Sequence, residues 1–214
     1  MKQILLFLGC VGIGIAVVIW YPKQKSTPVP TSISPTTIPA FSIEEAPSNA
    51  LQGTMRNLDG DVSWQSRTAT EPALLTSPVP VRQGELIRTA ENGSVTVLFP
   101  GSCSIDIGTD AIVDVIQTLP GHIVLRQDQG TVLYNATADC PLSVRTRRIL
   151  TVIQEGTIAV NLDADSDLIS VRVRKGVAEV AYNDVDNVST VLSVREGERF
   201  LFDNVERQGE ILSN

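Results

Sequence analysis

The sequence predicts an all-β body of stacked antiparallel hairpins, either a β-sandwich or a β-solenoid-like roll, preceded by one transmembrane α-helix. Three observations predict this organisation. Residues 4–21 form an apolar run without a charge, and residues 22–50 are rich in Ser, Thr and Pro. From residue 51 onward, short runs of alternating apolar and polar residues are separated by glycine turn signals, which is typical of strands and hairpins.

The apolar run has the length and the flanks of a membrane anchor. At about 1.5 Å of rise per residue, a helix over residues 4–21 just crosses the hydrocarbon core. Trp20 and Tyr21 suit the membrane interface, and Pro22 ends the helix. The alternatives are a cleavable signal peptide, disfavoured by bulky residues at the cleavage point, and a lipoprotein signal, disfavoured by the short apolar run before Cys10. We therefore expect an uncleaved single-pass anchor.

Charge alone does not decide the orientation of this anchor. Residues 1–3 would form a short cytoplasmic end, but Lys2 on one side is opposed by Lys23 and Lys25 on the other. Residues 22–50 have the composition of an extended stalk without a packed core. Because such stalks after a single anchor are typical of extracytoplasmic proteins, we expect the body in the periplasm or at the cell surface.

The rest of the chain is acidic. All 24 Asp and Glu residues lie at or after Glu44, whereas three of the 17 Lys and Arg residues lie before it. The remaining 14 basic and 24 acidic residues give that part of the chain a net charge of −10. Such a surface repels phosphate backbones, so we expect no nucleic-acid partner.

The predicted β body covers residues 51–203 and is followed by a tail at residues 204–214. Its best-defined stretch, residues 79–110, reads as three strands of a β-meander. An Asn-Gly pair at 92–93 and a Pro-Gly pair at 100–101 are the expected hairpin turns between these strands.

Glycine recurs between strand-like runs in the later half of the body. Gly130, Gly156, Gly176 and Gly197 follow one another at intervals of 26, 20 and 21 residues. Glycine takes positive φ at no steric cost, so we expect a tight turn at each of them. The structural turns predicted for the whole body are Gly84, Gly93, Gly101, Gly130, Gly156, Gly176 and Gly197.

The order of these motifs resembles the ferric-citrate-regulator (FecR) domain family. The motifs that carry the resemblance are V-x-x-G-[DE]-x-[IL]-x-T at residues 81–89 and [VL]-x-x-G-[EQ] at residues 194–198. Gly156-Thr157 is similar to the start of the family's G-T-x-[FA]-x-V signature, and residues 171–180 are similar to its V-x-V-x-x-G-x-V-x-V hairpin, with Ala178 in place of one valine. The resemblance covers about residues 51–203 and implies an extracytoplasmic FecR-like β domain. Family members that regulate iron transport carry an anti-sigma segment before the membrane helix. Only three residues precede the helix in this sequence, so we do not expect direct control of a sigma factor.

Two cysteines of the body are candidates for a disulfide. Cys103 and Cys140 lie 37 positions apart and would pair if the body lies in an oxidising compartment. Closing a loop of this size would stabilise the fold by roughly 3 to 4 kcal/mol. Two buried free thiols are the alternative, and the sequence leaves this choice open.

Residues for catalysis or metal binding are scarce. His122 is the only histidine and stands in a predicted turn, so neither a histidine pair nor a catalytic dyad with Cys or Ser is indicated. Asp163, Asp165 and Asp167 begin like a calcium loop, but Leu168 stands where the EF-hand pattern requires glycine. We therefore expect a solvated loop there, no enzyme activity, no metal site and no cofactor.

Basic residues recur on strands that we expect to be neighbours. If these strands pair, their side chains would form a patch for an anion or an acidic partner. The alternative is an exposed polar face that nearby carboxylates balance. The predicted patch consists of Arg145, Arg147, Arg148, Arg172, Arg174 and Lys175.

Together these features favour a membrane-anchored, extracytoplasmic binding module whose partner is a protein or an envelope glycan. Two other functions remain open. One is a transmembrane signalling regulator that passes an external signal to a separate membrane partner. The other is a structural envelope protein whose bodies associate into homo-oligomers.

Overall fold

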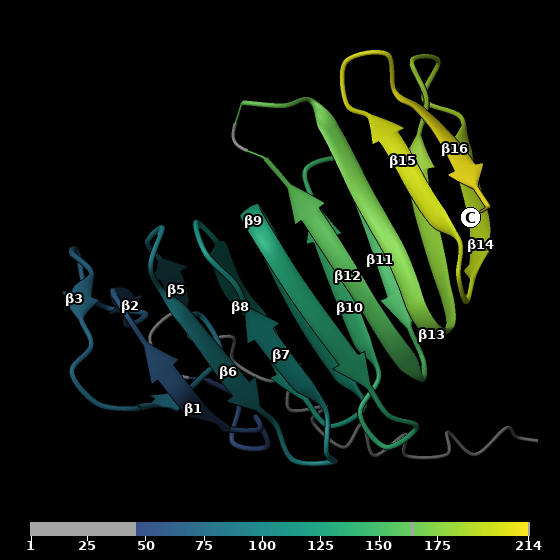
Figure 1. Ribbon diagram of the computed structural model, residues 1–214. Coiled ribbons are helices and arrows are strands. Elements are labelled where there is room, and N and C mark those ends of the chain that lie inside the picture. The colour runs from purple at the N-terminus through teal and green to yellow at the C-terminus, as the bar shows by residue number, and fades with distance from the viewer. Residues whose placement is uncertain (1–45, 164, 214) are drawn as a thin grey trace, which may run out of the picture. The chain divides into compact units, whose positions relative to one another are not determined.

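The computed structural model describes residues 46–163 and 165–213, and these residues form an all-β structure (Figure 1). They contain sixteen strands and no helix, which confirms the predicted all-β class. The predicted transmembrane helix and nearly all of the predicted stalk lie outside the described residues. Within the described residues, no helix has the length and apolar character needed to cross a bilayer.

The strands form two sheets, which we name sheet A and sheet B. Sheet A contains, in spatial order, β4 (Pro80–Val81), β1 (Gly53–Asp59), β6 (Ser94–Leu98), β7 (Ser104–Ile107), the second half of β9 (His122–Ala136), β12 (Gly156–Leu162), the first half of β13 (Leu168–Asn183), β15 (Arg199–Asp203) and β16 (Gln208–Leu212). Sheet B contains, in spatial order, β3 (Ala73–Leu74), β2 (Val62–Gln65), β5 (Leu86–Thr89), β8 (Ile112–Leu119), the first half of β9, β10 (Leu142–Thr146), β11 (Ile149–Ile153), the second half of β13 and β14 (Ser189–Arg195). The long strands β9 and β13 therefore belong to both sheets.

The two sheets lie face to face over a shared hydrophobic core, as the two layers of Figure 1 show. Val95 and Val97 of β6 and Ile105 and Ile107 of β7 are all buried, while the residues between them are partly exposed. This period-two alternation places every second side chain on the inner face of a sheet. The body is a two-layer sandwich whose layers are joined by continuous strands.

The chain passes between the sheets at bends that we call creases. Gly130 lies where β9 leaves sheet B for sheet A, and Gly176 lies where β13 leaves sheet A for sheet B. Gly156 is the first residue of β12, directly after the passage from β11, and Gly197 stands between β14 and β15; the chain changes sheet at both places. All four have positive φ, which glycine adopts without the steric cost that a Cβ brings.

The creases correct the prediction of tight hairpin turns at these four glycines. The predicted turn at Gly93 is also a passage between sheets, because β5 lies in sheet B and β6 in sheet A. Gly84 stands at the passage from β4 to β5, whereas Gly101 does lie in a hairpin turn, between the paired strands β6 and β7. A glycine in the sequence indicates a position where the backbone needs positive φ or where there is no room for a side chain. It does not indicate whether the chain forms a hairpin within one sheet or passes to the other sheet.

Two copies of the sequence V-R-x-G-E build the same local structure at two passages between sheets. They occupy residues 81–85 and 194–198. In each copy the arginine N–H donates a hydrogen bond to the glutamate Oε2, at 2.8 and 2.7 Å. Gly84 and Gly197 have φ values of 83° and 84°. In each copy the glutamate therefore stabilises the bend by accepting the backbone N–H of the arginine three residues earlier.

One pair of neighbouring strands is parallel, which departs from the expected antiparallel hairpins. The first half of β9 pairs with β10 in parallel, with Ile123 opposite Leu142. This pairing is possible because β9 folds over at its crease, so that the short turn at residues 137–141, closed by the Thr137–Cys140 bridge, leads from sheet A to β10 in sheet B. Cys140 on this connection forms a disulfide with Cys103, directly before β7, and both are buried. The pairing that the sequence leaves open is thus a disulfide in the structure.

The predicted tail is part of sheet A. β16 pairs with β15 along its whole length. Gly209 allows this close approach, because a Cβ there would lie 2.3 Å from the Phe200 ring. Residues 208–212 alternate only weakly in polarity, and the free edge of β15 supplies their pairing. The domain therefore extends to residue 212 and does not end at residue 203.

A buried polar pair braces the crease of β9. The Tyr134 hydroxyl donates to Gln127 Oε1 at 3.0 Å, and Gln127 Nε2 donates to the carbonyls of Gly130 and Val160 at 2.8 and 3.2 Å. Both side chains are fully buried. Every hydrogen-bonding atom of the Gln127 amide thus has a partner, as a buried polar group requires.

Tyr134→Phe is expected to lower the free energy of unfolding by about 1 to 3 kcal/mol, because it leaves the buried Gln127 Oε1 without a donor. Burial also raises the pKa of the Tyr134 phenol far above its usual value. An unfolded tyrosine ionises near pH 10, so the contribution of this group is present below about pH 10 and is lost as pH rises above it. Urea unfolding across the alkaline range measures both effects. A variant as stable as the wild type at pH 7 would contradict the bracing role.

Candidate functional site

A concavity of about 810 Å³ lies where three hairpin turns meet at one end of the body. These are the β10–β11, β13–β14 and β15–β16 turns. The residues that line the concavity are Arg145, Arg147, Arg148, Ile149, Leu150, Ala181, Tyr182, Asn183, Asn187, Ser189, Asn204 and Arg207. The site is therefore built from turns that the ends of the strands hold in place.

Four of the lining residues are arginines, and no Asp or Glu is among the described residues that line the concavity. Arg147 Nη1 donates to the Ser166 carbonyl at 3.1 Å and lies 3.4 Å from Asp167 Oδ1. Arg207 Nη1 donates to the Asp184 carbonyl at 3.3 Å. In the part of the chain that the structure describes, the other arginines, 145 and 148, make no ion pair. Positively charged side chains are thus concentrated at the concavity, whereas the body as a whole is acidic.

The backbone of this site has positive φ at three positions and is strained at the two that are arginines. Arg147, Asn187 and Arg207 have φ values of 49°, 61° and 52°. A two-residue hairpin loop usually carries Asn, Asp or Gly, whereas residues 147–148 are both arginine. A side chain in the left-handed region costs roughly 1 to 2 kcal/mol unless it is Gly or Asn. Strained residues of this kind are concentrated at functional sites, which favours a functional role for the two arginines.

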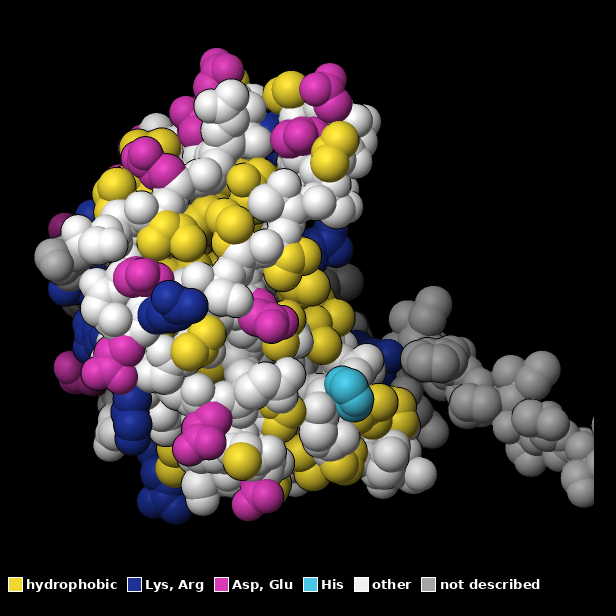
Figure 2. All heavy atoms as spheres, turned by 90° about the vertical axis from the view of Figure 1, so that its right-hand side faces the viewer, with side chains coloured by type: hydrophobic (Ala, Val, Ile, Leu, Met, Phe, Trp, Pro, Cys, Tyr) yellow, Lys and Arg dark blue, Asp and Glu magenta, His cyan; other side chains and the backbone are white. Residues whose placement is uncertain are grey.

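Among the acidic residues of the neighbouring loops, Asp167 forms an ion pair with Arg147, whereas others accept hydrogen bonds within their own turns. Asp184 Oδ1 accepts the N–H groups of Asp186 and Val188, at 2.9 and 2.8 Å. Asp203 Oδ1 accepts two N–H groups of its own turn in the same way. Figure 2 shows acidic side chains gathered at the end of the body that these turns form. They cap the turns and surround the concavity without entering it.

One polar atom of the site has no partner. Asn204 Oδ1 is buried and accepts no hydrogen bond within the described structure. The Asn204 backbone N–H is used, because it donates to the Asp167 carbonyl at 3.0 Å. An unmet buried acceptor costs roughly 1 to 3 kcal/mol. Because this oxygen is buried, the unmet acceptor belongs to the interior of the turn and not to the open surface of the concavity.

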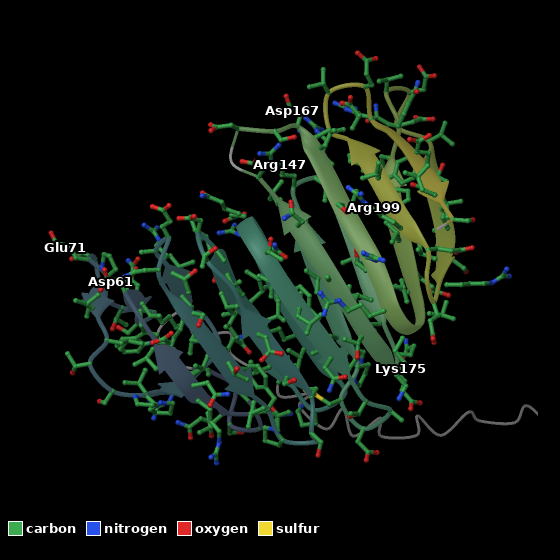
Figure 3. All side chains as sticks on the ribbon, in the orientation of Figure 1. Asp61, Glu71, Arg147, Asp167, Lys175 and Arg199 are labelled. Carbon is green, nitrogen blue, oxygen red and sulfur yellow. A yellow bond between two sulfur atoms is a disulfide. The ribbon has the colours of Figure 1, made fainter. Side chains whose placement is uncertain are left out.

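The structure divides the predicted basic patch in two. Its first three arginines line the concavity, but Arg172 lies on the sheet A half of β13, opposite Arg199. Lys175 lies beside the crease of β13 and lines a second hollow with Glu155, Glu179 and Glu196. Figure 3 shows Arg147 and Lys175 toward opposite ends of the strands. Because β13 changes sheet at Gly176, its residues after the crease, and not those before it, lie beside β11.

Arg207 and Asn204 were missed by the sequence analysis. Both lie in the β15–β16 turn, within the segment that was predicted to be a tail. Asp203-Asn204 ahead of Gly209 is a turn signal, and it would have extended the predicted sheet by one strand.

The other candidate residues do not form a site. His122 is the exposed first residue of β9. Asp163 Oδ1 accepts the Asp165 N–H at 3.2 Å, and Asp167 faces Arg147, as Figure 3 shows. Among residues 46–163 and 165–213, no group of three or more His, Cys, Asp or Glu side chains is placed to hold a metal ion.

Comparison with known proteins identifies the fold only. No protein-family model and no curated protein matches the chain. Two crystal structures, each described as a "putative anti-sigma factor" from Parabacteroides distasonis, are similar to it with a TM-score of 0.52 and sequence identities of 17% and 16%. Each match covers 60% of this chain and 59% of the solved chain. At this identity the likeness shows a shared β fold.

Proposed function

We propose that the β body is a non-catalytic binding module of the FecR-like kind, displayed outside the cytoplasm on a single transmembrane anchor. The observation that carries the proposal is the concavity with four arginines and no lining carboxylate. In a chain whose residues after Lys25 carry a net charge of −10, such a cluster favours an anionic ligand or partner. The arginine side chain is suited to this role because its planar group binds carboxylates and phosphates through two hydrogen bonds.

The disulfide supports the proposed compartment. Bonds such as Cys103–Cys140 persist in the periplasm and at cell surfaces, whereas cytosolic thiols are kept reduced. The apolar run at residues 4–21 and the following Ser/Thr/Pro-rich segment support the anchor and the stalk.

A second candidate function is signalling across the membrane. It is favoured by the fold that this chain shares with the two solved structures described as anti-sigma factors. In this case, the binding of a ligand to the body would be signalled through the anchor to a separate membrane protein.

The location of the body is testable with a reporter thiol. Cys103 and Cys140 are buried, so a membrane-impermeant maleimide would not reach them in the folded protein. Leu74 is 64% exposed and lies on β3, which contributes no residue to the concavity. We expect the full-length Leu74→Cys protein, with Cys10→Ser as background, to be labelled in intact spheroplasts.

The background protein without the reporter is the control for this measurement and should remain unlabelled. Labelling of the reporter only after lysis would place the body in the cytoplasm and overturn the proposed function.

A further inference from the structure

We infer that the ligand of the concavity is a short acidic saccharide, in which a carboxylate or phosphate group stands beside free hydroxyl groups. This inference rests on the proposed function, because it names the ligand class of the same site. Three features of the lining carry it: cations, neutral hydrogen-bonding side chains and an apolar wall.

The arginines of the lining favour a ligand that carries an anionic group. Arg145 and Arg148 are exposed and make no ion pair among the described residues, while Arg207 uses one nitrogen on a backbone carbonyl. Their remaining N–H groups are free to bind an oxyanion, and two parallel bonds from one guanidinium match a carboxylate or a phosphate. The strained backbone at Arg147 and Arg207 holds two of the four cations in the turns before a ligand arrives.

The neutral side chains of the lining favour a ligand that has hydrogen-bonding groups in addition to its anionic group. Asn183, Asn187, Asn204 and Ser189 also line the concavity. The Ser189 hydroxyl donates to Asn183 Oδ1 at 2.8 Å, which leaves the Asn183 amide donors and the Ser189 oxygen as an acceptor for a ligand. A carboxylate accepts hydrogen bonds but supplies no donor. Sugar hydroxyl groups both donate and accept, and so match a lining that contains amide and hydroxyl side chains.

The apolar wall suits the C–H surface of a sugar ring. Tyr182 lines the concavity and its ring packs against Phe200 and Phe202, with centroids 5.9 and 5.1 Å away. Leu150, which is 40% exposed, adds an aliphatic surface to the lining. The Tyr182 ring is therefore held in a fixed position by its packing against Phe200 and Phe202. The volume of about 810 Å³ lies within the range of ordinary ligand pockets, roughly 300 to 1,000 Å³.

The surroundings disfavour a broad anionic surface. Asp186 and Glu206 are exposed on turns beside the concavity, so a lipid bilayer with acidic headgroups would meet their negative charges as well as the arginines. A ligand small enough to enter the concavity avoids this rim. An acidic peptide could also enter, and the experiment below distinguishes it from a saccharide.

Calorimetric titration of the full-length protein in detergent micelles tests the inference. The probes are trigalacturonate, which carries carboxylates, and glucose 6-phosphate, which carries a phosphate. Maltotriose is the neutral control, and hexaglutamate is the acidic control without sugar. We expect at least one acidic sugar to bind, with maltotriose and hexaglutamate binding at least about tenfold more weakly, a factor that corresponds to one charge-assisted hydrogen bond or more.

Three variants test whether the ligand binds in the concavity. Arg148→Ala removes an exposed cation of the concavity and is expected to weaken binding by about tenfold or more. Arg174→Ala removes an equally exposed arginine outside the concavity and should leave the affinity unchanged. Arg147→Gly removes a cation and also relieves positive φ, so we expect weaker binding without a loss of thermal stability.

Several results would overturn the inference. Equal binding of hexaglutamate and the acidic sugars would show recognition of charge alone, and unchanged affinity in Arg148→Ala would place the ligand elsewhere. Absence of binding by both acidic sugars would reject the saccharide class. The location of the body is judged separately by thiol labelling, so failure of this inference and failure of the proposed function are distinguishable.

Discussion

Replacing Cys103 and Cys140 together with serine is expected to lower the free energy of unfolding by about 3 to 4 kcal/mol. The bond spans 37 residues and so removes conformational freedom from the unfolded chain. For a body of this size, the loss corresponds to a decrease in Tm of roughly 10 °C. Differential scanning calorimetry of the full-length protein, with and without reductant, measures the effect.

Cys10→Ser is the matched control, because it removes a thiol that lies outside the described residues. We expect it to leave the Tm unchanged, and reductant should have no effect on the double serine variant. A reductant-induced decrease of the same size in both the wild type and the double variant would show that the disulfide is not its cause.

Gly176→Ala is expected to lower the free energy of unfolding by about 3 kcal/mol or more, through two costs that add at one position. The first cost is backbone strain, because φ is 82°. The second is steric, because a Cβ would lie 2.6 Å from the Glu155 carbonyl oxygen of the neighbouring crease. Since that atom belongs to the backbone, relief requires one crease to move away from the other. Urea denaturation followed by tryptophan fluorescence measures the loss.

Gly197→Ala separates these two costs. Its φ of 84° is nearly the same, but no atom lies within 4 Å of the added Cβ. We expect it to cost only the strain, roughly 1 to 2 kcal/mol. Equal losses in the two variants would mean that the steric contact between neighbouring creases contributes nothing.

Strands such as β6 and β7 were predictable because each has one buried face. Alternation in β6 and β7 follows from their packing against the core, and period two is visible in the sequence whichever sheet a strand joins. The Pro-Gly pairs that end β6 and β8 also marked true hairpin turns. These features depend on neighbours in the chain, so sequence reasoning reaches them.

The arrangement of the strands was not predictable by the same reasoning. The two halves of β13 alternate alike, and the sequence does not say that they belong to different sheets. A glycine at a crease and a glycine in a hairpin turn meet the same conformational demand. The choice between them depends on long-range pairing, such as β9 with β10, which joins segments on either side of the disulfide connection.

The composition of the candidate site depends on this long-range strand pairing, which the sequence does not show. Arg145, Arg147 and Arg148 were singled out from their charge, and they do line one concavity. Arg172 and Lys175 were grouped with them because the bend in β13 was not foreseen. Arg207 joins the cluster only through pairing of β16 with β15.

The strands shared by both sheets have a consequence for how the body can respond to a ligand. In an ordinary sandwich, the layers are linked by loops and can slide over each other. Here β9 and β13 run through both layers as continuous extended backbone, so sliding would require breaking their ladders on one side. Motion on binding is therefore confined to the turns at the ends of the strands, and the rest of the body transmits force as a rigid frame.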